Sequence, residues 1–182
     1  MKNLGLSNVA ESMGSIPPGG YICKILDVED VPQKEYLKIK VDIAQGQYKG
    51  HYKNLEEQFS FWGLTWFMSY KDSALGLFKA GISALRASNE GFQWADDEEN
   101  DERKMIGCLV GGILGEEEYL GNDGSLKCNV KFKRAASVQD IIDGNYKVPE
   151  KKKLAAMDNT NEVVDTTIGS GFQPVDEDEM PF

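Results

Sequence analysis

The stretch that decides the fold is Tyr36-Leu37-Lys38-Ile39-Lys40-Val41-Asp42-Ile43, in which polar and apolar residues alternate without interruption. Side chains on a β-strand point alternately to its two faces, so this spacing predicts a strand with one buried and one solvated face. The solvated face is expected to carry Tyr36, Lys38, Lys40 and Asp42. Residues 126–133 repeat the alternation and are predicted as a strand with Leu126, Cys128, Val130 and Phe132 inward.

Further strands and a helix are predicted around these two segments. Residues 21–28 and 106–120 are apolar, β-prone runs, and the aromatic-rich stretch 47–61 is predicted as the strand that returns beside 36–43. Gly121-Asn122-Asp123-Gly124 predicts a hairpin turn, because glycine and asparagine accept positive φ. One amphipathic helix is predicted over residues 73–87, from the spacing of Leu75, Phe78, Ile82 and Leu85. Residues 137–143 are expected to form a short helical turn.

These elements predict a mainly β domain over residues 19–149. Five strands with one helix between the third and the fourth is the element order of an OB-fold, a small five-stranded β-barrel. Residues 1–18 are expected to precede the domain as a flexible arm. Residues 150–182 combine acids with few apolar residues and are expected to be a disordered acidic tail.

The composition narrows the classes of function. The 182 residues carry a net charge of −10. No basic residue follows Lys153, whereas that terminal segment holds seven acids, and six more lie in residues 96–102. Without these two segments the body has 17 acids against 20 bases, which is compatible with binding nucleic acid. From the polar N-terminal residues and the lack of a long apolar run we expect neither a signal peptide nor a membrane span, and the three scattered cysteines fit a reducing cytoplasm.

Enzyme chemistry finds little support in the sequence. His51 is the only histidine, so a zinc site or a Ser-His-Asp triad would have to use it. The acidic run 96–102 is a conceivable metal site of a nuclease, but a contiguous run of like charges is more typical of a solvated loop. No phosphate-binding glycine motif of the P-loop kind occurs. We therefore expect no enzyme, no cofactor and no metal.

A surface for single-stranded nucleic acid is the better-supported site. Such binding needs cations for the phosphates and flat rings on which bases stack. The solvated face of the strand predicted over residues 36–43, together with the strand predicted over 47–61, offers such groups: Tyr36, Lys38, Lys40, Tyr48, Tyr52 and Lys53. The last predicted strand adds Lys127, Lys131, Lys133 and Arg134. Each lysine can equally be an ordinary solvated residue, each tyrosine a cross-strand packing residue, and Trp62, Trp66 and Phe67 are expected in the core or a lid.

The chain closes with Asp176-Glu177-Asp178-Glu179-Met180-Pro181-Phe182, an acidic run followed by one apolar group. Such a tip suits docking into a basic pocket on another protein. It resembles the C-terminal peptide of bacterial and phage single-stranded DNA-binding proteins, which end in several acids, an apolar residue, Pro and Phe. The alternative is a merely solubilising tail.

The body is also similar to a family of small phage-encoded proteins regarded as single-stranded DNA-binding proteins. The motifs that carry this likeness are Gly19-Gly20-Tyr21, Tyr48-Lys49-Gly50, the predicted helix and Leu120-Gly121-Asn122-Asp123-Gly124. The resemblance implies a protein of the host bacterial cytoplasm that coats single strands in replication or recombination. Its tip would recruit replication or recombination proteins. An adaptor without DNA affinity is the alternative, and the oligomeric state, a homo-oligomer included, stays open.

Overall fold

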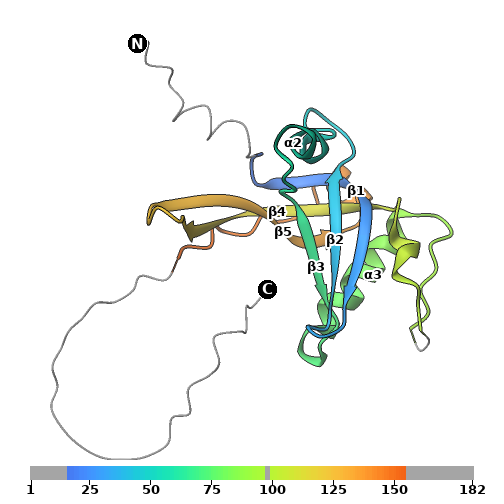
Figure 1. The fold of residues 1–182 in the computed structure, drawn as a ribbon. Coiled ribbons are helices and arrows are strands. Elements are labelled where there is room, and N and C mark those ends of the chain that lie inside the picture. The colour runs from blue at the N-terminus through green and yellow to red at the C-terminus, as the bar shows by residue number, and fades with distance from the viewer. Residues whose placement is uncertain (1–15, 97–98, 155–182) are drawn as a thin grey trace, which may run out of the picture.

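The computed structural model describes residues 16–96 and 99–154. Within these ranges five antiparallel strands form one open sheet in the order β3-β2-β1-β4-β5 (Figure 1). The strands are β1 (Gly19–Val31), β2 (Tyr36–Ile43), β3 (Thr65–Ser69), β4 (Leu109–Leu120) and β5 (Leu126–Ala136). The helices are α2 (His51–Phe59), α3 (Leu75–Ser88) and α4 (Val138–Asp143), none long and apolar enough to cross a membrane. The prediction of a mainly β domain of five strands is confirmed.

The long strand β1 holds the sheet together, because it pairs with different partners along its length. Its first half, from Gly19 to Lys24, pairs with β4, and the part from Cys23 onward pairs with β2. An irregularity in the pairing with β2 falls between Ile25 and Asp27, where a bulge bends the strand. The two edge strands approach each other through their side chains, since Trp66 of β3 stacks on Phe132 of β5 with ring centroids 5.0 Å apart.

The helix predicted over residues 73–87 is confirmed as α3, and it packs against the sheet. Ile82 and Leu85 are buried, whereas Leu75, predicted for the same stripe, is 40% exposed, so that part of the prediction is wrong. Gly81 lets the helix lie close to β3: a Cβ there would come within 2.9 Å of the Trp66 ring. Larger side chains at this position would push α3 away from β3.

The strand predicted over residues 47–61 is wrong: this stretch forms α2, and β3 follows it at Thr65–Ser69. Aromatic residues had suggested a strand, but Tyr52 and Leu55 are the residues of α2 that are buried, three positions apart as on one face of a helix. The prediction that Asp42 lies on a solvated face is wrong as well, because α2 covers the end of β2. Asp42 is only 5% exposed.

Asp42 fastens α2 to β2 by accepting three backbone hydrogen bonds. Its Oδ1 accepts from the N–H groups of Ile43 and Tyr52 at 2.8 and 3.0 Å, and its Oδ2 from that of Lys53 at 3.1 Å. The residue that precedes α2, Gly50, has no side chain to cap the helix. Asp42 supplies from the strand the acceptor that an N-cap side chain usually provides, and its charge suits the positive end of the helix dipole.

The ordered body extends beyond both predicted domain boundaries. Ile16, assigned to the flexible arm, is 1% exposed and belongs to the core. At the other end, Lys152 pairs in parallel with Glu117 of β4: its N–H donates to the carbonyl of Glu116, and its carbonyl accepts from the N–H of Glu118. The chain after α4 therefore occupies the edge of β4 that β1 leaves free.

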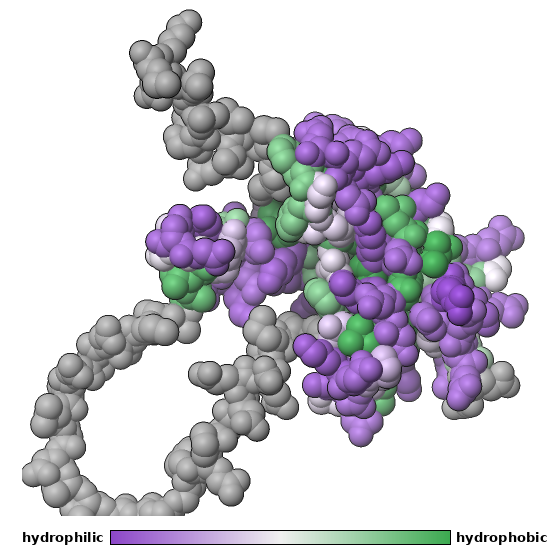
Figure 2. Space-filling model, viewed as in Figure 1, coloured by the Kyte–Doolittle hydropathy of each residue, from purple (hydrophilic) through white to green (hydrophobic). Residues whose placement is uncertain are grey.

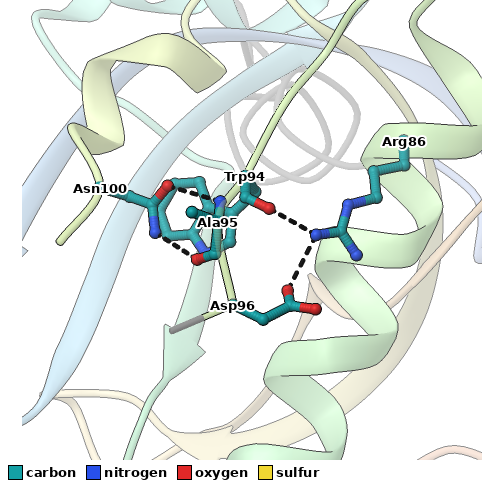
Figure 3. A network of polar contacts seen from close by, with 5 residues as sticks. All are labelled: Arg86, Trp94, Ala95, Asp96 and Asn100. Atoms are coloured by element: carbon teal, nitrogen blue, oxygen red, sulfur yellow. Dashed lines mark hydrogen bonds and ion pairs between the residues drawn. The ribbon is translucent and has the colours of Figure 1, made fainter. Parts of the chain in front are cut away.

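Side-chain contacts hold the described residues around the start of the acidic run (Figure 3). Arg86 of α3 donates from one nitrogen, Nη2, to the carbonyl of Trp94 at 2.5 Å and to the Asp96 carboxylate at 2.8 Å. The Asn100 side chain accepts from the N–H of Ala95 and donates to its carbonyl, as a paired strand would. In the described ranges no group of three or more histidine, cysteine or acidic residues is placed to hold a metal ion.

Replacing Asp42 by alanine should destabilise the fold by about 2–4 kcal/mol, because buried N–H groups at the start of α2 lose a charged acceptor. Asp42→Asn retains one acceptor oxygen and should cost less. Asp27→Ala, at an exposed position on neighbouring β1, is the matched control. Urea unfolding of the three variants measures the differences, and equal midpoints for Asp42→Ala and Asp27→Ala would contradict the assigned role.

Candidate nucleic-acid interface

The outer face of β2 and β3 brings aromatic rings and ammonium groups together. Lys38 lies opposite Phe67 in the register, and Lys40 lies opposite Thr65. Phe67 is 45% exposed, and the Tyr36 ring meets it edge-on with centroids 5.4 Å apart. We call this surface, with Trp62 described below, the β2–β3 face: Tyr36, Lys38, Lys40, Trp62 and Phe67.

Trp62 extends this face from the segment between α2 and β3. The Lys40 Nζ lies 4.1 Å from the centroid of the Trp62 ring, a cation–π contact. The Trp62 Nε1–H donates to the carbonyl of Leu64 at 2.5 Å, which fixes the orientation of the indole. The half-buried ring is thus held beside a cation, and the residue before it, Phe61, is 63% exposed.

Carboxylates already accompany both lysines of the β2–β3 face. Lys40 pairs with Glu56 of α2 at 2.7 Å, and Lys38 pairs with Glu29 of β1 at 3.6 Å. An anion that binds here has to compete with these two groups. Exposed ion pairs contribute only about 0–1 kcal/mol, so such competition is affordable for a phosphate.

Tyr48, Tyr52 and Lys53 were also predicted as binding residues. They lie in or next to α2, apart from the β2–β3 face. Tyr52 is 2% exposed in the core, so it offers no ring to a base, and that assignment is wrong. Burial raises the pKa of its phenol well above the ordinary value. Lys53 is exposed in the first turn of α2, and Tyr48 is half-buried just before the helix. The His51 ring lies edge-on between Tyr48 and Tyr52, as a packing residue.

Three of the four basic residues predicted on the last strand, Lys127, Lys131 and Lys133, lie on a hairpin arm formed by the outer halves of β4 and β5. Arg134 lies in the body of the sheet, opposite Ile113. Glu117 of β4 binds Lys133 at 2.6 Å, Lys131 at 3.5 Å and Lys152 at 4.0 Å. Lys127 pairs with Asp123 at 3.4 Å, and Arg134 is exposed. Three of the four predicted residues thus have carboxylate partners within the arm.

The arm and the β2–β3 face are separate surfaces. In Figure 1 the hairpin projects to the left, whereas β2 and β3 stand at the front of the body. Its tip is hydrophobic on one side, where Leu120 and Leu126 are 60% and 59% exposed (Figure 2). Leu126 and Cys128 were predicted to face the core, but the arm continues beyond the core and leaves both exposed.

Trp62 and Phe67 are the site residues that sequence reasoning missed, having placed them in the core or a lid. The signal for Phe67 is present in Thr65-Trp66-Phe67-Met68-Ser69, where Trp66 and Met68 are buried and Phe67, between them, points outward. No comparable periodicity marks Trp62, which lies outside any strand.

Comparison with known proteins adds no identification. No protein-family model matches the chain, and no curated protein sequence matches it. The acidic tip of residues 176–182 lies outside the described residues.

The arm predicts a pH dependence of stability. Burial alone would raise the pKa of Glu117, but the hydrogen bond from Lys133 and the charges of Lys133, Lys131 and Lys152 lower it overall. A carboxyl whose pKa is lowered on folding stabilises the protein above its unfolded pKa, and the effect is lost as pH falls through the folded one. Glu117→Gln should therefore be less stable than the parent at pH 7.

This difference in unfolding free energy should shrink as the pH falls below about 4, where unfolded glutamate becomes protonated. Denaturant unfolding at a series of pH values measures it. Glu57→Gln, at an exposed position on α2 for which no ion pair is recorded among the described residues, is the control. A Glu117→Gln deficit that is constant with pH would contradict the ion-pair account.

Proposed function

We propose that this protein binds single-stranded DNA across the β2–β3 face and recruits replication or recombination proteins through its acidic tip. One observation carries the first part: exposed Phe67, flanked by Tyr36, Lys38 and Lys40, beside the Trp62–Lys40 pair. Rings and cations in one surface are what sequence-tolerant binding of single strands requires. The second part rests on the sequence of the tip.

We further propose that the sheet is an OB-fold barrel. The strand order β3-β2-β1-β4-β5 becomes a barrel when β3 meets β5, and the Trp66–Phe132 stack supports that proximity. An OB-fold binds oligonucleotides on the face of strands 2 and 3, which is where the exposed rings gather here. The fold and the site therefore support the same function.

An adaptor that lacks DNA affinity is the second candidate. The ion pairs of Lys38 with Glu29 and of Lys40 with Glu56 favour it, because they already neutralise the cations of the face. One measurement distinguishes the two candidates. A DNA-binding protein binds labelled oligo(dT) at low salt as the full chain, whereas an adaptor without DNA affinity does not. Binding should also exceed that to duplex and fall as salt rises, since contacts to phosphates release counterions.

Phe67→Ala should weaken binding to oligo(dT) by about 1–3 kcal/mol, the usual contribution of one base–aromatic stack. Phe67→Tyr preserves the ring and should bind like the parent. Fluorescence anisotropy of labelled oligo(dT) measures both. If Phe67→Ala binds as tightly as the parent, the face is not the interface.

Lys38→Glu tests the cationic part of the face. It should weaken binding and reduce the steepness of its salt dependence, because a phosphate contact is lost. Lys79→Glu, an exposed lysine on α3, makes the same charge change away from the face. Equal losses for the two variants would indicate a general effect of net charge rather than a site.

Deleting residues 176–182 should leave the melting temperature unchanged and abolish capture of partner proteins. Affinity for oligo(dT) should stay equal or rise, most clearly at low salt, because acids that repel phosphates are removed. Calorimetry and anisotropy test the first and last outcomes. A truncated chain that unfolds or no longer binds DNA would show that the tip belongs to the body instead.

A further inference from the structure

A concave surface separate from the β2–β3 face lies at the start of β1. It is a groove with a volume of about 530 Å³, and tyrosines supply its aromatic walls: Tyr21, Tyr48 and Tyr146. The Tyr146 ring packs so closely on the backbone of Gly20 that a Cβ at Gly20 would collide with the ring. Tyr21 is fixed from the other side, since its hydroxyl donates to the carbonyl of Pro17 at 2.6 Å.

The lining of the groove is neutral. It contains no charged residue, and the hydrogen-bonding side chains besides the tyrosines are Gln45 and Gln47. Exposed lysines directly follow two of the tyrosines in the chain, Lys49 after Tyr48 and Lys147 after Tyr146, and the acids Asp140 and Asp143 flank Ile141 and Ile142 of the lining. Neutral amides and rings suit the edges and faces of nucleobases, and lysines beside them suit phosphates.

A row of packed rings joins this groove to the β2–β3 face. Tyr21 meets Tyr48 at 6.0 Å between centroids, Tyr48 meets His51 at 6.3 Å, and His51 meets Tyr52 at 5.0 Å. Tyr52 then contacts Trp62 at 6.3 Å. The two surfaces are thus the two ends of one continuous row of packed rings, and Lys53, next to Tyr52 on α2, is exposed.

We propose that the groove is a second base-binding subsite, in which one or more bases of the same DNA strand stack on Tyr48 and Tyr146. The strand would run from the β2–β3 face past Lys53 into the groove. This inference rests on the proposed function and adds to it residues for which no DNA contact was predicted: Tyr21, Gln45, Gln47, Lys49, Tyr146 and Lys147.

A length series of labelled oligo(dT) tests the proposal on the full chain. Single OB-folds cover about 4–16 nucleotides, so the series spans that range. The affinity of the parent should rise with length until both surfaces are occupied. Tyr48→Ala and Tyr146→Ala should bind the shortest oligonucleotide like the parent and the longest about 5- to 150-fold more weakly. Tyr48→Phe and Tyr146→Phe retain the rings and should keep most of the affinity.

Charge reversal gives a test that does not alter packing. Lys147→Glu, at an exposed position next to Tyr146 in the chain, should weaken binding of long oligonucleotides only, whereas Lys79→Glu on α3 should not change the length dependence. Tyr119→Ala, at a tyrosine 41% exposed on the arm, is the matched aromatic control.

The outcomes separate the inference from the function on which it rests. If the groove variants match the parent at every length while Phe67→Ala weakens all lengths, the subsite is refuted and the β2–β3 interface stands. Binding of a proline-rich peptide that Tyr146→Ala abolishes, without effect on oligo(dT), would also refute it. If the parent binds no oligonucleotide of any length, both proposals fail.

Discussion

The arrangement of the candidate interface depends on one buried carboxylate. Asp42 accepts hydrogen bonds from the N–H groups of Tyr52 and Lys53 and thereby joins the start of α2 to the end of β2. This contact places Tyr52 in the core and directs the chain after α2 back to β3, which brings Trp62 beside Lys40. The same helix separates the tyrosine groove from the β2–β3 face while packing rings beneath both. Without it, neither surface would have its present form.

The proposed interface with DNA would combine a stronger and a weaker contribution to the binding free energy. Each stacked base contributes about 1–3 kcal/mol, and an exposed ion pair only about 0–1 kcal/mol. Exchange of Glu29 and Glu56 for phosphates around Lys38 and Lys40 is therefore nearly balanced in free energy. If the proposed function holds, the rings set the affinity for DNA, whereas the lysines set its dependence on salt. On the arm, Glu117 contacts three lysines at once, which makes those cations less accessible to a strand.

The sequence predicted the elements whose pattern is local. The alternation in β2 and the helical spacing in α3 identified both elements, because burial on one face acts on each segment separately. The nature of α2 could not be found in this way. Its aromatic residues are of the kind that is common in strands. The group that caps the helix is Asp42 on β2, ten residues before Tyr52.

The difference between local patterns and tertiary contacts also explains which residues of the candidate site could be predicted. Tyr36, Lys38 and Lys40 were predicted because alternation fixes their direction, whereas Trp62 acquires its place from the packing of α2 and β3. The alternation of β5 was correct as a strand pattern but wrong for Leu126, since the arm outruns the core that would cover it. Periodicity predicts which side of a strand a residue occupies, and only the tertiary structure decides what covers that side.

The central claim is that a single DNA strand lies across the β2–β3 face. Photocrosslinking tests this claim most directly. The full chain would be irradiated with oligo(dT) carrying 5-bromodeoxyuridine, and the crosslinked peptides identified by mass spectrometry. We expect crosslinks at Trp62, Phe67 and Tyr36, lost when unlabelled oligo(dT) is added in excess. Crosslinks confined to the arm or to α3, or none that the competitor removes, would contradict the claim.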